Sequence, residues 1–190
     1  MNKTVSVIPV LTAGLLSFPA WAGNTNAQGI PNFHAVNDHI YRGGQPSQEG
    51  WNSLAKLGVK TVIDLRRDGE DHDHWIKTEA LAVETAGMRY VSVPMEGMAT
   101  PSDEQIRKVL DVLGSGESVF VHCKKGKDRT GTVIACYRIE HDRWTNDRAL
   151  KEAKSLGIHW VEFAMKHYIS NYKAGSGNLA GMPDTAVVRP

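Results

Sequence analysis

Cysteine is scarce in this chain, because only Cys123 and Cys136 occur among its 190 residues. Two cysteines could form one disulfide. However, Cys136 is expected about two turns along the helix that follows Cys123, which corresponds to roughly 10 Å of rise. A disulfide needs Cα atoms within about 7 Å of each other. The sequence therefore predicts no disulfide and a core position for Cys136.

An excess of charge of one sign is also lacking, since 22 lysines and arginines face 21 aspartates and glutamates, for a net charge of +1. This balance excludes a globally basic nucleic-acid-binding protein, so no nucleic-acid partner is expected. Positive charge is instead local, at Lys124, Lys125, Lys127 and Arg129. The chain has no internal repeats or low-complexity blocks, and its length favours one domain with a proper core.

The one long apolar run lies near the N-terminus, from Val5 to Pro19, and it is short for a bilayer span. Lys3 precedes it, and Ala20-Trp21-Ala22 fits a small-x-small cleavage site. We therefore expect residues 1–22 to be a signal peptide, with an uncleaved anchor as the alternative. Cleavage would leave Gly23 as the first residue, with no transmembrane segment and no cysteine for a lipid anchor. The expected location is periplasmic or secreted.

The remaining chain alternates apolar strand patterns with helical ones, which is typical of an α/β fold with a mainly parallel central sheet flanked by helices. We expect a flexible leader over 23–31, a folded domain over 32–173 and a disordered tail over 174–190. The expected strands are 39–42, 59–65, 89–93 and 118–122. The expected helices are 47–57, 73–86, 101–113, 131–141, 146–156 and 160–172.

The most informative segment runs from Val119 to Gly131 and reads as a buried strand, a glycine-containing loop and a helix start. Such a loop points several backbone N–H groups at one spot, and the helix dipole favours negative charge there. Arg129 can grip two phosphate oxygens with its planar fork. The same positive field lowers the pKa of the Cys123 thiol. The pattern therefore indicates cysteine-dependent hydrolysis of phosphate esters.

Residues 122–131, HCKKGKDRTG, resemble the signature loop of the protein tyrosine phosphatase superfamily, and the small dual-specificity-like branch is the best match. Residues 41–47, YRGGQPS, and 59–66, VKTVIDLR, resemble N-terminal motifs of bacterial and atypical dual-specificity phosphatases. The resemblance runs from about residue 32 to about residue 172. It implies a cysteine-phosphatase fold and hydrolysis of phosphate monoesters.

The expected reaction has two steps and uses neither a metal nor another cofactor. The Cys123 thiolate attacks phosphorus to form a phosphocysteine, which water then hydrolyses. Arg129 and the loop amides stabilise charge on the equatorial oxygens. The residues expected to bind the substrate phosphate are Lys124, Lys125, Gly126, Lys127 and Thr130. We expect His122 to support the loop rather than to carry a proton.

The general acid is where the sequence departs from the family, whose members usually carry an aspartate on the loop after the strand at 89–93. Here that loop, residues 94–100, has the sequence PMEGMAT. Asp128 in the signature loop is the favoured catalytic acid, because some lipid-directed relatives place an aspartate there. Glu96 on the expected loop is the alternative. Asp103 ranks third, since it reads as a helix-dipole partner.

Several readings stay open at this point. Lysines beside the site suit a phosphoprotein, a phosphoinositide or an inositol phosphate as the phosphorylated substrate. A phosphate-binding pseudophosphatase and a rhodanese-like or arsenate-reducing enzyme are the rival functions. Asp64 and Arg66 are expected to be structural. Residues 71–74, DHDH, read as an acidic helix start rather than a metal site, because adjacent helical residues point in different directions.

Overall fold

The structure is a computed structural model that describes residues 27–70 and 75–175. The predicted signal peptide, most of the predicted tail and the DHDH segment at 71–74 lie outside these residues. No helix in the described ranges is long and apolar enough to cross a membrane.

A five-stranded sheet forms the centre of the molecule, with the strand order β1-β2-β5-β3-β4. β1 pairs antiparallel with β2, and the other neighbouring pairs are parallel, as expected for a mainly parallel sheet. β3 and β5 are buried along their whole length, which explains their nearly continuous apolar sequences. The strands are β1 (His34–Ala35), β2 (Ile40–Gly43), β3 (Thr61–Asp64), β4 (Arg89–Ser92) and β5 (Val119–His122).

Several helices begin at residues that the sequence marks as caps. The side chain of Ser47 accepts a hydrogen bond from the backbone N–H of Gly50 at the start of α1, and Ser102 and Gln105 form the expected capping box at α3. The described helices are α1 (Gln48–Lys56), α2 (Trp75–Thr85), α3 (Asp103–Leu113), α4 (Asp128–Glu140), α5 (Asn146–Ser155) and α6 (Phe163–Asn171).

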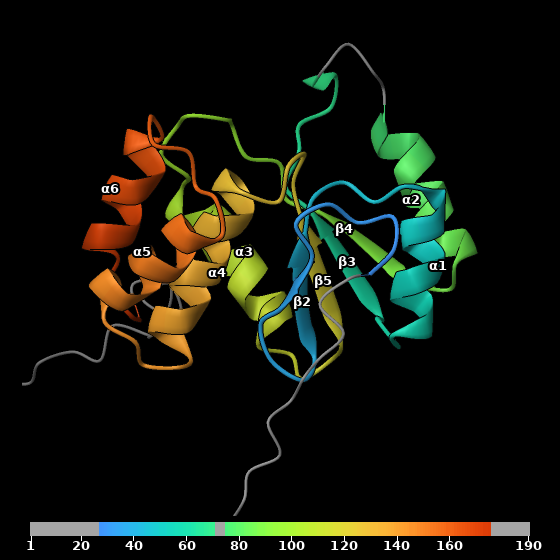
Figure 1. The fold of residues 1–190 in the computed structure, drawn as a ribbon, viewed down its shortest axis with the longest axis horizontal. Helices are drawn as coiled ribbons and strands as arrows, with labels where there is room; N and C mark the ends of the chain where they lie inside the picture. The colour runs from blue at the N-terminus through green and yellow to red at the C-terminus, as the bar shows by residue number, and fades with distance from the viewer. Residues whose placement is uncertain (1–26, 71–74, 176–190) are drawn as a thin grey trace, which may run out of the picture.

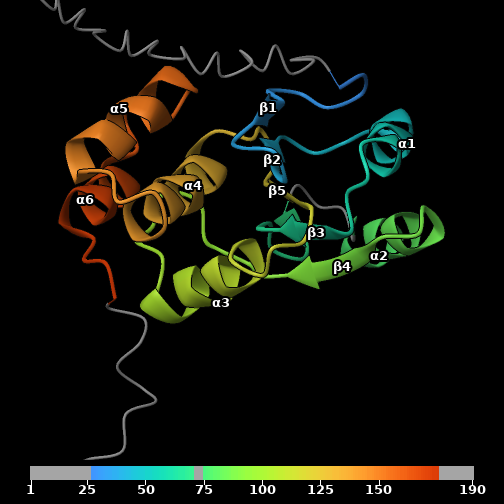
Figure 2. The same ribbon diagram turned by 90° about the horizontal axis from the view of Figure 1, so that it is seen from below.

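The helices cover both faces of the sheet (Figure 1). α1 and α2 lie on one face, whereas α3, α4, α5 and α6 lie on the other (Figure 2). Each face has its own apolar core, with Trp51, Val62 and Phe120 under α1 and α2, and with Ile63 and Ile134 under the larger group. Burial on both faces fixes the sheet and places the carboxyl ends of its parallel strands at one edge.

Several expected boundaries differ from the structure, and one short strand was not predicted. The helix predicted at 131–141 begins at Asp128, because the catalytic loop itself folds into its first turn and the Gly131 N–H donates to the carbonyl of Lys127 over 2.7 Å. The helix predicted at 160–172 begins at Phe163, since residues 159–162 form a turn instead. The short edge strand β1 was not predicted, because a two-residue strand leaves no periodic pattern.

The predicted boundary at residue 32 also differs from the fold. Within the expected leader, Ile30 is buried in the core under α1 and α2, and the carbonyl of Gly29 accepts the N–H of Ser47 over 2.9 Å. Residues 27–31 therefore belong to the packed domain. At the other end, the N–H of Gly175 donates to the carboxylate of Glu140 over 2.8 Å.

Candidate active site

The predicted nucleophile sits at the centre of the catalytic edge. Cys123 directly follows β5, the middle strand of the sheet, and the loop after it leads into the N-terminus of α4. The loops that follow β3 and β4 leave the sheet at the same edge, the upper edge in Figure 1. Cys123 is buried and is not bonded to Cys136, which is also buried and free. The prediction of no disulfide between the two cysteines is therefore confirmed.

The turn in the catalytic loop requires glycine. Gly126 has a left-handed φ of +67°, and a Cβ atom there would lie 2.3 Å from the backbone of Gly43 and 2.4 Å from that of Gly44. The close approach packs the catalytic loop onto the end of β2. Residues 43 and 44 belong to the YRGGQPS stretch, so that stretch acts as the base of the loop.

Two side chains beneath the loop hold its shape, and neither was predicted to have a role. The guanidinium of Arg42 donates to the carbonyl of Gly126 over 2.6 Å, and the Asn32 amide donates to the same oxygen over 2.8 Å. Arg42 is fully buried, and burial lowers its pKa to about 10, still high enough to keep it charged at neutral pH. A buried cation under the loop adds to the positive field around Cys123.

The electrostatics at Cys123 favour the thiolate. Burial alone would raise the pKa of this thiol. The Arg129 guanidinium, the Thr130 hydroxyl, and the backbone N–H groups of Thr130 and Gly126 outweigh burial and lower the pKa below its ordinary value. Cys136 shows the opposite behaviour, because burial raises the pKa of its thiol and no cation offsets that effect. Only Cys123 therefore has the environment of a nucleophile.

Arg129 is held from behind by a residue that sequence reasoning missed. Its Nη1 and Nη2 atoms donate to the two carboxylate oxygens of Glu70, each over 2.6 Å. Nη1 also lies 3.3 Å from the carbonyl oxygen of Met95 and 3.4 Å from that of Leu65. Its Nε atom donates to no residue in the described ranges. The clamp therefore fixes the guanidinium plane and leaves an Nε edge for a phosphate.

The five residues predicted to bind the substrate phosphate differ in exposure. Lys124, Lys125 and Lys127 are exposed, while Gly126 and Thr130 are buried. The aliphatic part of Lys127 packs over Gly157, where a Cβ atom would lie 3.2 Å from its Cδ. The exposed ammonium groups surround the loop with positive charge, and the backbone between them supplies the N–H donors.

His122 is the centre of a fully buried polar network. Its Nε2 lies 2.8 Å from Oε1 of Glu79, and its Nδ1 lies 3.3 Å from the carbonyl oxygen of Cys123. Because both ring nitrogens face acceptors, only the doubly protonated imidazolium can donate to both. Burial alone would lower the pKa of His122, but the carboxylates of Asp64 and Glu79 outweigh it and raise that pKa.

Asp64 and Arg66 complete this network, as a structural role predicts. The guanidinium of Arg66 donates to both carboxylate oxygens of Asp64, over 3.0 and 2.8 Å, and also to Glu79. Asp64, Glu79 and His122 are close enough together to be considered as metal ligands. Arg66 binds both carboxylates directly, however, so the positive charge that a metal would supply is already in place.

The candidate general acids occupy different surroundings. Oδ1 of Asp128 accepts the backbone N–H of His159 over 2.7 Å, which ties α4 to the turn before α6. Glu96 lies beside Met95, whose carbonyl approaches the guanidinium of Arg129, and it pairs with Arg67 over 2.7 Å. Glu96 thus lies on a loop that reaches the catalytic arginine, whereas Asp128 lies within the loop itself.

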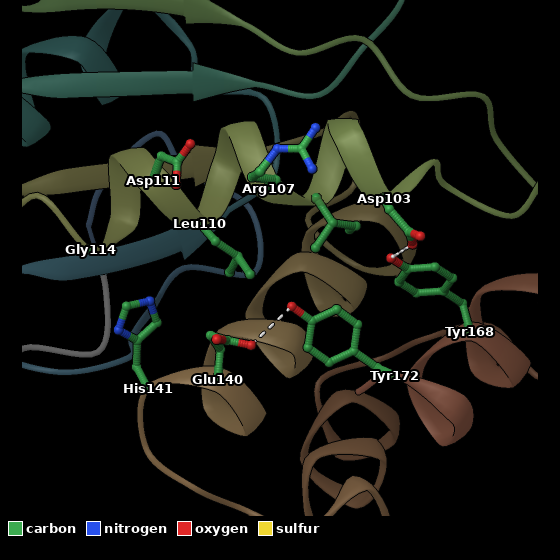
Figure 3. A pocket seen from close by; sticks show the side chains of 10 residues that line it. Asp103, Arg107, Leu110, Asp111, Gly114, Glu140, His141, Tyr168 and Tyr172 are labelled. Atoms are coloured by element: carbon green, nitrogen blue, oxygen red, sulfur yellow. Dashed lines mark hydrogen bonds between the residues drawn. The ribbon is translucent and has the colours of Figure 1, made fainter. Parts of the chain in front are cut away.

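Asp103, the third candidate, belongs to another part of the molecule. It lines a cavity of about 290 Å³ between α3, α6 and the C-terminal end of α4, and its carboxylate accepts the hydroxyl of Tyr168 over 2.7 Å (Figure 3). Its charge contributes to the raised pKa of the core residue Cys136. Asp103 is therefore a structural residue at the start of α3, as its low rank predicted.

Comparison with known proteins agrees with this geometry. The family model for "DSP-PTPase phosphatase fused to NAD+ Kinase" matches residues 18–171. The dual specificity protein phosphatase TpbA of Pseudomonas aeruginosa is 31% identical over 162 residues, which cover 78% of this chain and 70% of TpbA. The inositol diphosphatase DSP5 of Arabidopsis thaliana is 30% identical over 139 residues, which cover 68% of this chain and 64% of DSP5.

A solved structure extends the likeness to three dimensions. The crystal structure of a P. aeruginosa TpbA variant in complex with pTyr superposes with a TM-score of 0.67 at 26% identity, covering 85% of this chain and 96% of that one. The strand that leads into the catalytic loop and the helices on both faces are thus placed as in a known phosphatase fold. The family match and the kinship with TpbA show that this chain belongs to the DSP-PTPase phosphatases and is a phosphoric monoester hydrolase.

Proposed function

We propose that this protein is a metal-independent cysteine phosphatase of the protein tyrosine and dual-specificity type, acting through a phosphocysteine intermediate. The observation that carries the proposal is the buried Cys123 thiol, whose pKa is lowered by the clamped Arg129 at the N-terminus of α4. A thiolate in this position can attack a phosphorus atom whose oxygens are bound by the loop N–H groups and the guanidinium.

The steps follow from the chemistry of the site. The sulfur of Cys123 forms a bond to phosphorus, and the bond from phosphorus to the ester oxygen breaks. The leaving oxygen takes a proton from a carboxylic acid, for which we propose Asp128, with Glu96 as the alternative. Water then attacks phosphorus, which releases inorganic phosphate and restores the thiolate. Positive charge from Arg129 serves both steps, so no step requires a metal ion.

The test is hydrolysis of para-nitrophenyl phosphate by the chain from Gly23, with and without EDTA. We expect activity that survives EDTA, disappears in Cys123→Ser and persists in the control variant Cys136→Ala. Mass spectrometry of acid-quenched enzyme should find the phosphoryl group on the peptide that contains Cys123. Vanadate binding without any turnover by the wild-type protein would instead identify a pseudophosphatase.

A second candidate substrate class is inositol phosphates or phosphoinositides. It is favoured by the three exposed lysines of the loop and by the likeness to a protein named an inositol diphosphatase. Phosphate release from an inositol polyphosphate and from a tyrosine-phosphorylated peptide should be compared at equal concentration. The substitution Lys127→Gln removes one positive charge. It should lower phosphate release from the inositol polyphosphate more than from the peptide, because a polyanion gains more from each nearby cation.

We also propose that residues 1–22 direct export and are then removed, which would place the enzyme in the periplasm or outside the cell. The proposal is supported by Lys3, the apolar run after it and the small residues Ala20 and Ala22. The intact mass of protein recovered from fractionated bacteria tests it. A chain that begins at Gly23 in the exported fraction is expected, whereas a full-length chain confined to the cytoplasm would contradict it.

A further inference from the structure

A pocket of about 720 Å³ lies between α1 and α2 and extends to the catalytic loop. α1 and α2 lie beside each other on one face of the sheet in both views (Figures 1 and 2). The residue at the loop end of the pocket is Lys124, which directly follows the nucleophile. The volume is in the range of sites that enclose an organic group.

The lining of this pocket is mostly apolar. Pro46, Trp51 and Ala82 supply its carbon surface from the two helices and the segment before α1. Among the charged lining residues, Arg66 and Glu79 are paired with each other. The lining therefore offers mainly carbon surface, with Lys124 at the end near the loop, which suits an apolar group attached to an anion better than a polyanion.

One polar group in the wall lacks a partner of its own. The side-chain amide of Gln45 donates to Glu79 over 2.8 Å and to the carbonyl of Pro46 over 3.3 Å. Its Oε1 atom is buried and accepts no hydrogen bond in the part of the chain that the structure describes. Buried acceptors are rarely left unpaired, so the wall at Gln45 is not fully satisfied in its present packing.

The same residue connects the pocket to the phosphate site. The backbone N–H of Gln45 donates to the carbonyl of Lys124 over 3.0 Å, so the pocket wall continues into the catalytic loop. A substrate whose phosphate is bound by the loop can extend from there along Lys124 into the pocket. The pocket is thus placed to contact the part of the substrate that does not react.

We propose that this pocket is a specificity subsite for a large apolar side chain that neighbours the phosphorylated residue of a protein substrate. The apolar side chain of the substrate would pack against Trp51 and Ala82, with Lys124 between the pocket and the bound phosphate. An inositol polyphosphate is a poor occupant, since it would place anionic groups against carbon and near the carboxylate of Glu79. This inference rests on the proposed phosphatase function.

The test uses tyrosine-phosphorylated peptides that are identical except for leucine or alanine next to the phosphotyrosine, placed in turn on each side. For the wild-type enzyme we expect kcat/KM to be about tenfold higher with leucine on one side, because burial of the longer apolar side chain lowers the free energy of binding. In Ala82→Phe, which fills the pocket, this leucine-to-alanine ratio should fall close to one. Each ratio is taken within one variant, so a general change in activity cancels.

The control is Leu81→Phe, which adds bulk at an exposed position on the same helix and should keep the ratio. If Ala82→Phe does not fold, Gln48→Trp at the exposed pocket mouth provides a second obstruction with the same expected loss. The inference would be overturned if the leucine and alanine peptides have equal kcat/KM at every position. It would also be overturned if the leucine-to-alanine ratio is unchanged in both Ala82→Phe and Gln48→Trp. Wild-type enzyme that cannot cleave para-nitrophenyl phosphate would instead overturn the proposed function.

Discussion

The buried network around His122 leads to a prediction about Glu79. The carboxylates of Asp64 and Glu79 raise the pKa of His122 and so favour its protonated form, whose positive charge, together with that of Arg66, balances their two negative charges. Replacing the carboxylate in Glu79→Gln leaves Asp64 and Arg66 as a neutral pair. His122 then no longer balances any charge and, being fully buried, should become neutral. Because total buried charge stays at zero, the fold should survive the substitution.

The expected consequence is a higher pKa for the Cys123 thiol. His122 immediately precedes Cys123, and its ring lies against the carbonyl of that residue. A unit charge at roughly 6 Å, with an effective dielectric constant of about 20, changes the energy of a thiolate by about 3 kcal/mol. That energy corresponds to about two pKa units. Because the substitution also removes the negative charge of Glu79, whose effect on the thiolate is opposite in sign, we expect a smaller rise in the pKa of Cys123, of about one unit at most.

The assay is the rate of alkylation of Cys123 by iodoacetamide as a function of pH, followed by mass spectrometry. Glu84→Gln, at an exposed position on the same helix, is the control and should match the wild type. In a variant that already contains His122→Asn, adding Glu79→Gln should not raise the midpoint further. An unchanged alkylation midpoint in a folded Glu79→Gln protein would refute the coupling through the histidine.

The same network determines how stability depends on pH. The pKa of His122 is raised in the folded state, so protonated His122 stabilises the fold fully below the unfolded-state pKa, near 6.5. That stabilisation is lost as pH rises through the folded-state pKa. Urea unfolding of the wild type should therefore show a decline in stability above about pH 6.5. In Glu79→Gln, the share of this decline that comes from the deprotonation of His122 should be absent.

Further predictions concern the loop and its clamp. Glu70→Gln should lower kcat/KM for para-nitrophenyl phosphate by about tenfold, because the catalytic arginine loses one charged partner; unchanged kinetics would mean that the clamp is dispensable. Asp128→Asn should slow the hydrolysis of alkyl phosphates more than that of aryl phosphates, because poor leaving groups depend more on the general acid. If Glu96→Gln shows this selectivity and Asp128→Asn does not, Glu96 is the general acid. Gly126→Ala should abolish activity and lower Tm by more than Gly116→Ala, which has a similar φ but no atom within 4 Å of the added Cβ; equal shifts in Tm would contradict the packing argument.

Local sequence patterns predicted the parts of the fold that depend on neighbouring residues. Contacts within a few positions determine the helix caps at Ser47 and Ser102 and the buried strand before Cys123. These features could therefore be predicted directly from the sequence. The start of α4 could not, because the side chain of the N-cap residue Lys127 makes no capping hydrogen bond and the first turn is built from the catalytic loop. Propensity alone gives no signal for a helix that begins without a cap.

The supporting residues of the site were missed for a different reason. Arg42 contacts Gly126 across 84 positions, and Glu70 contacts Arg129 across 59. These distances in sequence are closed by the parallel pairing of β2, β5 and β3, which a single sequence does not reveal. The YRGGQPS stretch was recognised as a motif, but its arginine could be assigned to the loop only once the strand order was known.

Both supporting carboxylates come from one segment of the chain, since Glu70 precedes α2 and Glu79 lies within it. Glu70 holds the arginine that would bind phosphate, and Glu79 holds the histidine behind the nucleophile. The position of this segment therefore affects the binding of phosphate and the ionisation of the thiol together. Loosening α2 from the sheet should change both properties, even when neither carboxylate is altered.

Val83→Ala tests this coupling, because Val83 belongs to α2, is fully buried against the sheet and lies outside the active site. The cavity should cost about 2 kcal/mol of stability. At a temperature where the variant stays folded, we expect a raised KM for para-nitrophenyl phosphate together with a higher alkylation midpoint for the nucleophilic thiol. Leu81→Ala, at an exposed position on the same helix, should change neither. A lower Tm with unaltered KM and midpoint would show that each carboxylate acts independently of the packing of α2.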